Sequence, residues 1–235
     1  MIKLIVLLFV FLFFGHSKKS SDEIKWVLVE GGPTGDFYIS GTEVTFTQYD
    51  EYCDATGSKK PYDEGWGRGD RPVINLTLAD AKRYCEWLSN KTGDDIRLPE
   101  EDEWEYAASG GNESNRYIYS GSNDLDEVGW YWVNSGDIKL SGIWSYEIIF
   151  ENNCKTQKVG TKNSNELGIY DMSGNAWEWV GENGYIRGGS WNNTNENCTI
   201  YYRNNNKRNY RHDYIGFRIL RDINTDENED ESEAE

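Results

Sequence analysis

The stretch that most constrains the fold is residues 170–218, near the C-terminal end of the chain. It contains two blocks: residues 170–179 read YDMSGNAWEW, and residues 187–218 open with RGGSW and close with IGFR. Between that opening and closing lies a run made largely of Asn, Tyr and Arg. We interpret the ends of the second block as scaffold and the run between them as a working surface. The rest of the chain then serves as the platform.

Composition is consistent with one domain that is rich in loops. A chain of 235 residues is long enough to bury a sizeable core. Its 10 Trp and 16 Tyr are many for this length, so aromatic rings should do much of the packing that Leu and Ile do elsewhere. With 24 Gly and 4 Pro, the chain is expected to turn often and tightly.

The net charge of −17 is partly the property of the C-terminal end. Eight of these 17 surplus negative charges lie after Arg221, which leaves a body with a net charge of −9. We expect residues 222–235 to be a solvated, disordered acidic tail. An acidic body without a basic stripe argues against nucleic acid as a partner.

The N-terminus predicts export. An unbroken apolar run extends from Leu4 to Phe14, too short to span a bilayer but suited to a signal peptide. The end of this run is similar to a bacterial lipoprotein signal, yet His16 stands where the lipid-bearing Cys would be needed. We expect residues 1–16 to be a signal peptide or N-terminal anchor, 17–25 a linker and 26–221 the domain, at the cell surface or in the periplasm.

The helices are predicted by their capping signals. An amphipathic helix is expected over residues 47–56, and a second begins after Thr77, with Asp80 in the capping-box position and Gly93 as its stop. A third should start near Pro99, where acidic residues favour the positive end of the helix dipole rather than forming a catalytic pair. Strands are expected over residues 25–30 and 36–40. Residues 110–161 show no usable periodicity.

Three ordered blocks resemble the formylglycine-generating-enzyme or sulfatase-modifying-factor domain family. They are residues 72–108, with DAxxYCxWL and RLPxxxEWEYA, residues 168–179, and residues 187–218. The resemblance implies an α+β fold of the C-type lectin-like type, with two main helices, short antiparallel strands and many loops. It covers roughly residues 26–221.

The resemblance also implies what chemistry to expect. The family's enzymes oxidise a sulfatase cysteine with two active-site cysteines, which fall here on Asn193 and Cys198. Asn cannot replace a thiolate as nucleophile or soft-metal ligand, so we expect neither oxidase activity nor copper. The four cysteines of an exported chain permit two disulfides with three connectivities. Cys85 matches a family half-cystine whose partner position holds Ile219, and Cys53 is the substitute partner we consider.

Calcium is the one metal that the resemblance favours. By position in the motif, the ligands would be the Asp171 side chain, the carbonyls of Gly174 and Ala176, and the Glu178 carboxylate. Such a set of hard oxygen donors suits calcium. The alternative is that Asp171 and Glu178 only hydrogen-bond the turn. With two histidines in the chain, zinc has few ligands to draw on.

The run at residues 192–214 resembles the variable region of diversity-generating retroelement proteins. Thr, Ile, Tyr, His and Asp interrupt its asparagines, and each is reached from the Asn codon AAC by changing one adenine. Tyr offers large semi-rigid contacts and Asn offers adaptable hydrogen bonds, as in antibody loops. The expected contact residues are Asn192, Asn193, Tyr201, Tyr202, Asn204, Asn205, Asn206, Tyr210, His212, Asp213 and Tyr214. Trp191, Arg203, Arg211, Phe217 and Arg218 should be framework.

These features lead to three hypotheses. The first is a non-catalytic, exported, monomeric protein that binds a protein or carbohydrate ligand through a diversified surface. The second is an oxidase of the formylglycine-generating type, which Asn193 weakens. In the third, the run is an ordinary Asn-rich edge of a fixed accessory protein whose partner binds elsewhere.

Overall fold

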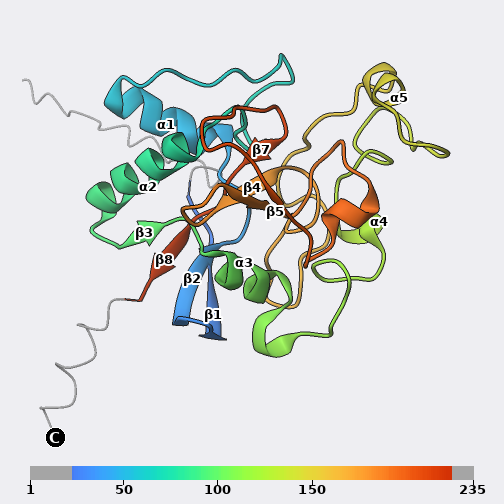
Figure 1. The fold of residues 1–235 in the computed structure, drawn as a ribbon. Helices are drawn as coiled ribbons and strands as arrows, with labels where there is room; N and C mark the ends of the chain where they lie inside the picture. Colours follow the sequence, from blue (N-terminus) through green and yellow to red (C-terminus); the bar gives the residue numbers. More distant parts are fainter. Residues whose placement is uncertain (1–22, 224–235) are drawn as a thin grey trace, which may run out of the picture.

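A computed structural model describes residues 23–223 and shows an α+β architecture of short elements joined by long loops (Figure 1). The strands are β1 (Trp26–Gly32), β2 (Gly35–Ser40), β3 (Ile96–Arg97), β4 (Trp177–Val180), β5 (Tyr185–Arg187), β6 (Arg203–Asn205), β7 (Ile215–Gly216) and β8 (Leu220–Asp222). The helices are α1 (Phe46–Thr56), α2 (Leu78–Thr92), α3 (Glu101–Ala108), α4 (Leu125–Val128) and α5 (Tyr146–Glu151), with 3-10 turns η1 (Gly111–Glu113) and η2 (Asn195–Cys198). Within residues 23–223, no helix is both long enough and apolar enough to cross a membrane.

The strands form two sheets. One has the order β1-β2-β8-β3 and is antiparallel throughout, so it joins the first and last strands of the domain. The other has the order β6-β5-β4-β7, in which β4 and β7 run parallel to each other. The expected short antiparallel strands are therefore present, with one parallel pair that the sequence did not indicate.

The acidic tail begins later than expected. Asp222 lies in β8 opposite Phe37, and its carboxylate accepts a hydrogen bond of 2.7 Å from Arg97 Nε. The boundary at residue 222 is thus corrected, because an ion pair and a strand hold Asp222 to the domain. Residues 224–235 and the expected signal segment, residues 1–16, lie outside the described residues.

The two long helices follow their capping signals. In α2 the Thr77 side chain accepts from the Asp80 backbone N–H while Asp80 reaches back to Thr77, a full capping box. The helix ends at Gly93, which takes the left-handed conformation with φ of 85°. Helix α1 begins with the same device at Thr45. The two helices contact each other through stacked rings of Tyr49 and Tyr84, whose centroids are 5.5 Å apart.

Aromatic side chains fill the core, as the composition predicts. Trp104, Trp179 and Phe217 are fully buried. The indole N–H of Trp179 donates to the Leu76 carbonyl at 3.2 Å, and that of Trp104 donates to a Glu178 carboxylate oxygen at 2.6 Å. Each buried indole therefore keeps a hydrogen-bond partner, which is the condition for burying it without penalty.

Residues 110–161 are held by polar contacts rather than by a periodic apolar face. The Asn152 side chain donates to the Ile138 carbonyl at 2.9 Å, and its backbone carbonyl accepts from Asp137 N–H at 2.9 Å. The Ser135 hydroxyl donates to the Trp191 carbonyl at 2.8 Å. Helix α5 stands out from the body at the end of this region (Figure 1).

All four cysteines are buried and unpaired. The Cys53 thiol donates to the Lys59 carbonyl at 3.7 Å, so the Cys53–Cys85 disulfide considered from the sequence is not formed in this structure. Burial supplies the physical reason that these thiols can remain as small apolar side chains.

Candidate ligand-binding surface

The opening of the second block is anchored in the interior. Arg187 is buried, and its guanidinium donates to Glu101 at 2.9 Å and to Glu105. The guanidinium carbon also lies 5.3 Å from the centre of the Trp104 ring. The acidic start of α3 therefore does more than favour the helix dipole, because it neutralises a buried arginine more than eighty positions along the chain.

The closing of the second block is anchored in a similar way. The Arg218 guanidinium donates to both oxygens of Glu178, with Nε–Oε2 of 2.6 Å and Nη2–Oε1 of 2.7 Å. Both side chains are buried, and Phe217 beside them is fully enclosed. A buried bidentate pair is costly to break because it leaves an unpaired charge in the interior.

Of the expected calcium ligands, Glu178 belongs to this pair, and Asp171 is close enough to interact electrostatically with both of its members. The Asp171 carboxylate is buried, and its Oδ2 accepts from Gly160 N–H at 2.6 Å while Oδ1 has no partner. Glu43, also buried, leaves Oε2 without a partner. Burial raises the pKa of Asp171 to about 6, and burial followed by the nearby Asp171 and Glu178 raises the pKa of Glu43 well above its usual range.

Of the two expected carboxylate ligands, only Asp171 keeps an oxygen without a hydrogen-bond partner. An orphaned, buried carboxylate oxygen is a vacant ligand, whereas both Glu178 oxygens already accept from Arg218 and Trp104. Among residues 23–223, no three His, Cys, Asp or Glu side chains are grouped so that they could hold a metal ion. Calcium here would depend on Asp171 together with backbone carbonyls of residues 174 and 176.

Between its two anchors, the run at residues 192–214 presents tyrosine to solvent. Tyr201, Tyr202 and Tyr210 are 63%, 37% and 42% exposed. Asn204 and Asn205 are exposed on β6, at the edge of its sheet, and Asn206 follows them half-buried. The Tyr202 ring lies 6.0 Å from Trp177, so this tyrosine is steadied by the core while its outer face stays open.

The end of the run forms a ladder of rings. Tyr210 meets His212 edge to face at 5.6 Å, and His212 stacks on Tyr214 at 4.5 Å. His212, Asp213 and Tyr214 line one wall of a cavity of about 900 Å³, and Tyr146 and Phe150 from α5 line another. The structure thus brings this part of the expected surface together around a cleft.

Asn192 and Asn193 occupy a different position from the other expected contact residues. The Ser190 hydroxyl is close enough to bond the amide oxygens of both, at 2.9 and 2.7 Å. Asn192 is buried, and its backbone carbonyl accepts from the Trp144 indole at 2.7 Å. These two residues lie at the base of the surface and not at its rim.

The expected framework residues divide into two groups. Trp191, Phe217 and Arg218 are buried. Arg203 and Arg211 are exposed, but each pairs with a carboxylate of a helix, Arg203 with Glu101 at 3.3 Å and Arg211 with Asp80 at 2.6 Å. They act as framework through ion pairs rather than through burial.

Sequence reasoning missed the contribution of α5. Ile143 and Phe150 are 86% and 85% exposed, and Tyr146 is also exposed. The signal was present as a mostly apolar segment over residues 143–150, interrupted by Ser145 and Glu147, but it had no periodicity to place it. These side chains extend the apolar surface beyond residues 192–214.

Neither position of the family's active-site cysteines presents an exposed thiol in the described structure. Cys198 is fully buried, and burial raises the pKa of its thiol to about 12. Asn193 is held by Ser190. A thiol with such a raised pKa is almost never a thiolate at neutral pH, so it is a poor nucleophile.

Comparisons with known proteins agree with the fold. A curated relative, "Chaperone protein LppX" of Paenibacillus barcinonensis, is 38% identical over 209 residues, which covers 69% of this chain and 72% of the relative. "Formylglycine-generating enzyme" of Bos taurus is 32% identical over 120 residues, covering 49% of this chain and 28% of the enzyme. The chain therefore spans less than a third of that enzyme's length.

A solved structure shows the same architecture. "Treponema denticola variable protein 1" superposes with a TM-score of 0.64 and 22% identity, covering 86% of this chain and 93% of the other. Residues 29–223 match the family model of the Sulfatase-modifying factor enzyme 1-like domain. The chain therefore belongs to this family and has its C-type lectin-like fold.

Proposed function

We propose that this chain is a non-catalytic, exported binding protein that engages its ligand through the run at residues 192–214. The observation that carries the proposal is a contrast in burial within residues 187–218, between the two ends of this block and the run between them. Arg187, Trp191 and Arg218 are buried, while Tyr201, Tyr202 and Tyr210 are open to solvent. Exposed aromatic side chains on a rigid frame are typical of surfaces selected for contact.

The chemistry of the surface supports an extracellular ligand such as a protein or a carbohydrate. Tyr presents a large ring with a hydroxyl at low cost in conformational entropy, and Asn provides adaptable donors and acceptors. The likeness to the Treponema denticola variable protein supports a surface of this kind on this fold. Because the ends are fixed by buried ion pairs, replacing the exposed side chains leaves the scaffold intact. The protein acts as a monomer in this proposal.

The test is on the gene. We expect the flanking DNA to contain a near-copy of codons 187–218 whose mismatches fall almost only at adenines, with a reverse transcriptase gene nearby. Such a copy would identify the diversified positions directly. Absence of the copy in the complete flanking sequence would overturn diversification and leave a fixed binding domain.

A chaperone role is the second candidate, because of the relative named as a chaperone and the exposed apolar side chains on and just before α5. Ile143 precedes the helix, Tyr146 and Phe150 lie on it, and all three are highly exposed. Exposed apolar patches of this kind mark interaction sites. In this case the protein should suppress aggregation of chemically denatured lysozyme, and Phe150→Ser should abolish the effect. A Tyr201→Ser variant, which alters an exposed ring outside α5, serves as the control.

The oxidase alternative makes a different prediction. Incubation with a sulfatase-motif peptide and copper should yield no aldehyde, because position 193 is Asn and the Cys198 thiol is buried. Aldehyde formation would overturn the non-catalytic proposal.

A further inference from the structure

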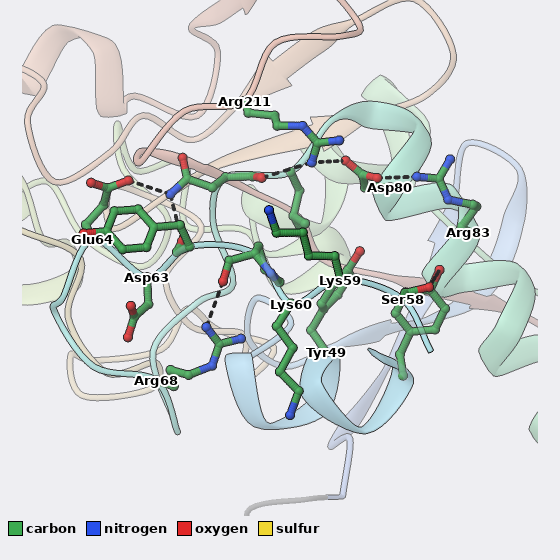
Figure 2. A pocket seen from close by; sticks show the side chains of 15 residues that line it. Tyr49, Ser58, Lys59, Lys60, Asp63, Glu64, Arg68, Asp80, Arg83 and Arg211 are labelled. Atoms are coloured by element: carbon green, nitrogen blue, oxygen red, sulfur yellow. Dashed lines mark hydrogen bonds and ion pairs between the residues drawn. The ribbon is translucent and has the colours of Figure 1, made fainter. Parts of the chain in front are cut away.

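A second cavity, of about 990 Å³, lies between α1, α2, the loop at residues 57–70 and the end of the run at residues 192–214, here called the variable run (Figure 2). It differs from the cleft at residues 212–214 in composition. Side chains of five Lys and Arg and of three Asp and Glu line it, together with three tyrosines. A local excess of cations is unusual in a chain with a net charge of −17.

The carboxylates of this cavity already accept hydrogen bonds from the protein, Asp80 most fully. Asp80 accepts from Arg83, from Arg211 at 2.6 Å and from the Thr77 cap. Glu64 accepts from the Asn75 amide at 2.8 Å, and Asp63 accepts from the Gly65 backbone N–H at 3.3 Å. An incoming cation would therefore have to displace internal donors.

Three of the five cations, Lys59, Arg83 and Arg211, have capacity left, whereas Arg68 is paired with Asp50 and Lys60 with Asp54. No carboxylate within residues 23–223 pairs with the Lys59 ammonium, and Figure 2 shows this side chain turned toward Arg211. Arg83 and Arg211 are each 54% exposed at the side chain, and each uses few of the five N–H donors of a guanidinium. The cavity therefore presents open donors and positive charge to a ligand with acceptor oxygens.

Lys60 provides a natural contrast. It also lines the cavity, but its ammonium is paired with Asp54 at 2.8 Å, and Figure 2 shows it turned the opposite way from Lys59. The two neighbouring lysines thus carry the same charge, but the Lys60 ammonium is already neutralised by Asp54, whereas no carboxylate of the described residues pairs with Lys59.

Tyrosine rings complete the wall. Tyr62 is 65% exposed at the rim, and Tyr49 and Tyr52 lie deeper, on α1. The C–H face of a pyranose ring packs on an aromatic ring, and the tyrosine hydroxyl can exchange hydrogen bonds with sugar hydroxyls. The cations suit a carboxylate, and the exposed tyrosine ring suits a sugar ring. An acidic sugar has both groups, whereas a bare ion would leave the ring unused.

We propose that this cavity binds an acidic sugar, with its carboxylate between Lys59, Arg83 and Arg211 and its ring on Tyr62. The site goes beyond the function proposed above, since it uses the platform of α1, α2 and the loop at residues 57–70. The variable run supplies Arg211, and that side chain is fixed by Asp80 whatever its neighbours are.

The test is calorimetry on the whole protein with methyl glucuronide, and with methyl glucoside as the uncharged match of the same ring. The glucuronide should bind at least about tenfold more tightly than the glucoside. Lys59→Ala should weaken glucuronide binding by about tenfold or more, and so should Tyr62→Ala, while Lys60→Ala leaves it unchanged. Circular dichroism of each variant checks that the fold is retained.

Three outcomes would overturn the proposal. Equal affinity for glucuronide and glucoside would remove the role of charge. Equal losses of glucuronide affinity in Lys59→Ala and Lys60→Ala would indicate a non-specific attraction by the positive charge of this surface. Inorganic phosphate or glucose 6-phosphate binding as tightly as the glucuronide would make this a general anion site. Tyr201→Ala with Tyr210→Ala separates the two proposals, since it removes the proposed variable surface and should leave glucuronide binding intact.

Discussion

At the scale of single residues, Asp213 shows that a residue of the run at 192–214 can lower the stability of the fold at neutral pH. It is half-buried beside the cleft, and burial followed by the nearby Glu64 raises the pKa of its carboxyl, with His212 acting in the opposite direction. Its ionised form is thus poorly stabilised in the folded protein. Because the folded-state pKa is raised, this residue contributes stability below about pH 4 that is lost as pH rises through the raised pKa.

Replacement by an amide should reveal this cost. We expect Asp213→Asn to be more stable than wild type at pH 7 and to lose the advantage at pH 3, where the wild-type carboxyl is protonated. Urea unfolding at the two pH values measures the difference. In a Glu64→Gln background the advantage at pH 7 should shrink, since one cause of the raised pKa is removed. A variant less stable than wild type at pH 7 would contradict the prediction.

Asp171 offers the test of calcium. If calcium binds there, CaCl₂ should raise the melting temperature of wild type by about 2–4 °C for each kcal/mol of binding linkage. Asp171→Asn keeps an acceptor for Gly160 N–H but removes the orphaned anionic oxygen, so its melting temperature should not respond. MgCl₂ at the same ionic strength is the control. No response of the wild type to calcium would contradict a calcium site at Asp171.

At the scale of elements, the turn that opens the second block tolerates only glycine. Gly189 has φ of +76°, and a Cβ built on it would lie 2.6 Å from Cys198 Sγ and 2.9 Å from the Asn197 carbonyl oxygen. Gly189→Ala should therefore destabilise the protein by about 2 kcal/mol or more, through strain and a steric clash.

Gly142 is the matched control for that prediction. Its φ is +97°, but a Cβ there would meet nothing within 4 Å. Gly142→Ala adds backbone strain alone, on the order of 1 kcal/mol. Chemical unfolding of both variants compares them, and equal losses would show that contact with η2 does not matter.

Elements with local signals could be predicted, and elements without them could not. Thr77, Asp80 and Gly93 fixed α2 because caps act within one turn. The acidic start of α3 predicted a helix, but its pairing with Arg187 depends on a fold that brings distant residues together. Residues 110–161 resisted prediction because contacts such as Ser135 to Trp191 span many positions and leave no period.

At the scale of the whole molecule, the candidate sites could not be predicted in full, because their walls also depend on contacts between residues far apart in the sequence. The cleft at residues 212–214 needs α5, which is more than sixty positions away in sequence, and the second cavity needs Arg211 beside Asp80. The exposure of Tyr201, Tyr202 and Tyr210 could be predicted from the resemblance of the run, but Tyr214, expected to be exposed with them, is half-buried against the core. The walls that turn these rings into a site could not be predicted, because they come from loops whose placement is tertiary.

In the molecule as a whole, the proposed binding residues should contribute little to stability, and the buried residues that frame them should contribute much. Simultaneous randomisation of positions 201, 202, 204, 205 and 210 should leave most members of a displayed library resistant to protease. These side chains are exposed, and exposed substitutions each change stability by about 0.5 kcal/mol or less. Randomising positions 191, 217 and 218 should leave few resistant members, since these side chains are buried and Arg218 neutralises Glu178. Breaking that pair alone should cost about 3–5 kcal/mol, a large part of the 5–15 kcal/mol of a typical domain. Similar survival of the two libraries would mean that the run at residues 192–214 is part of the fold and not a surface carried by it.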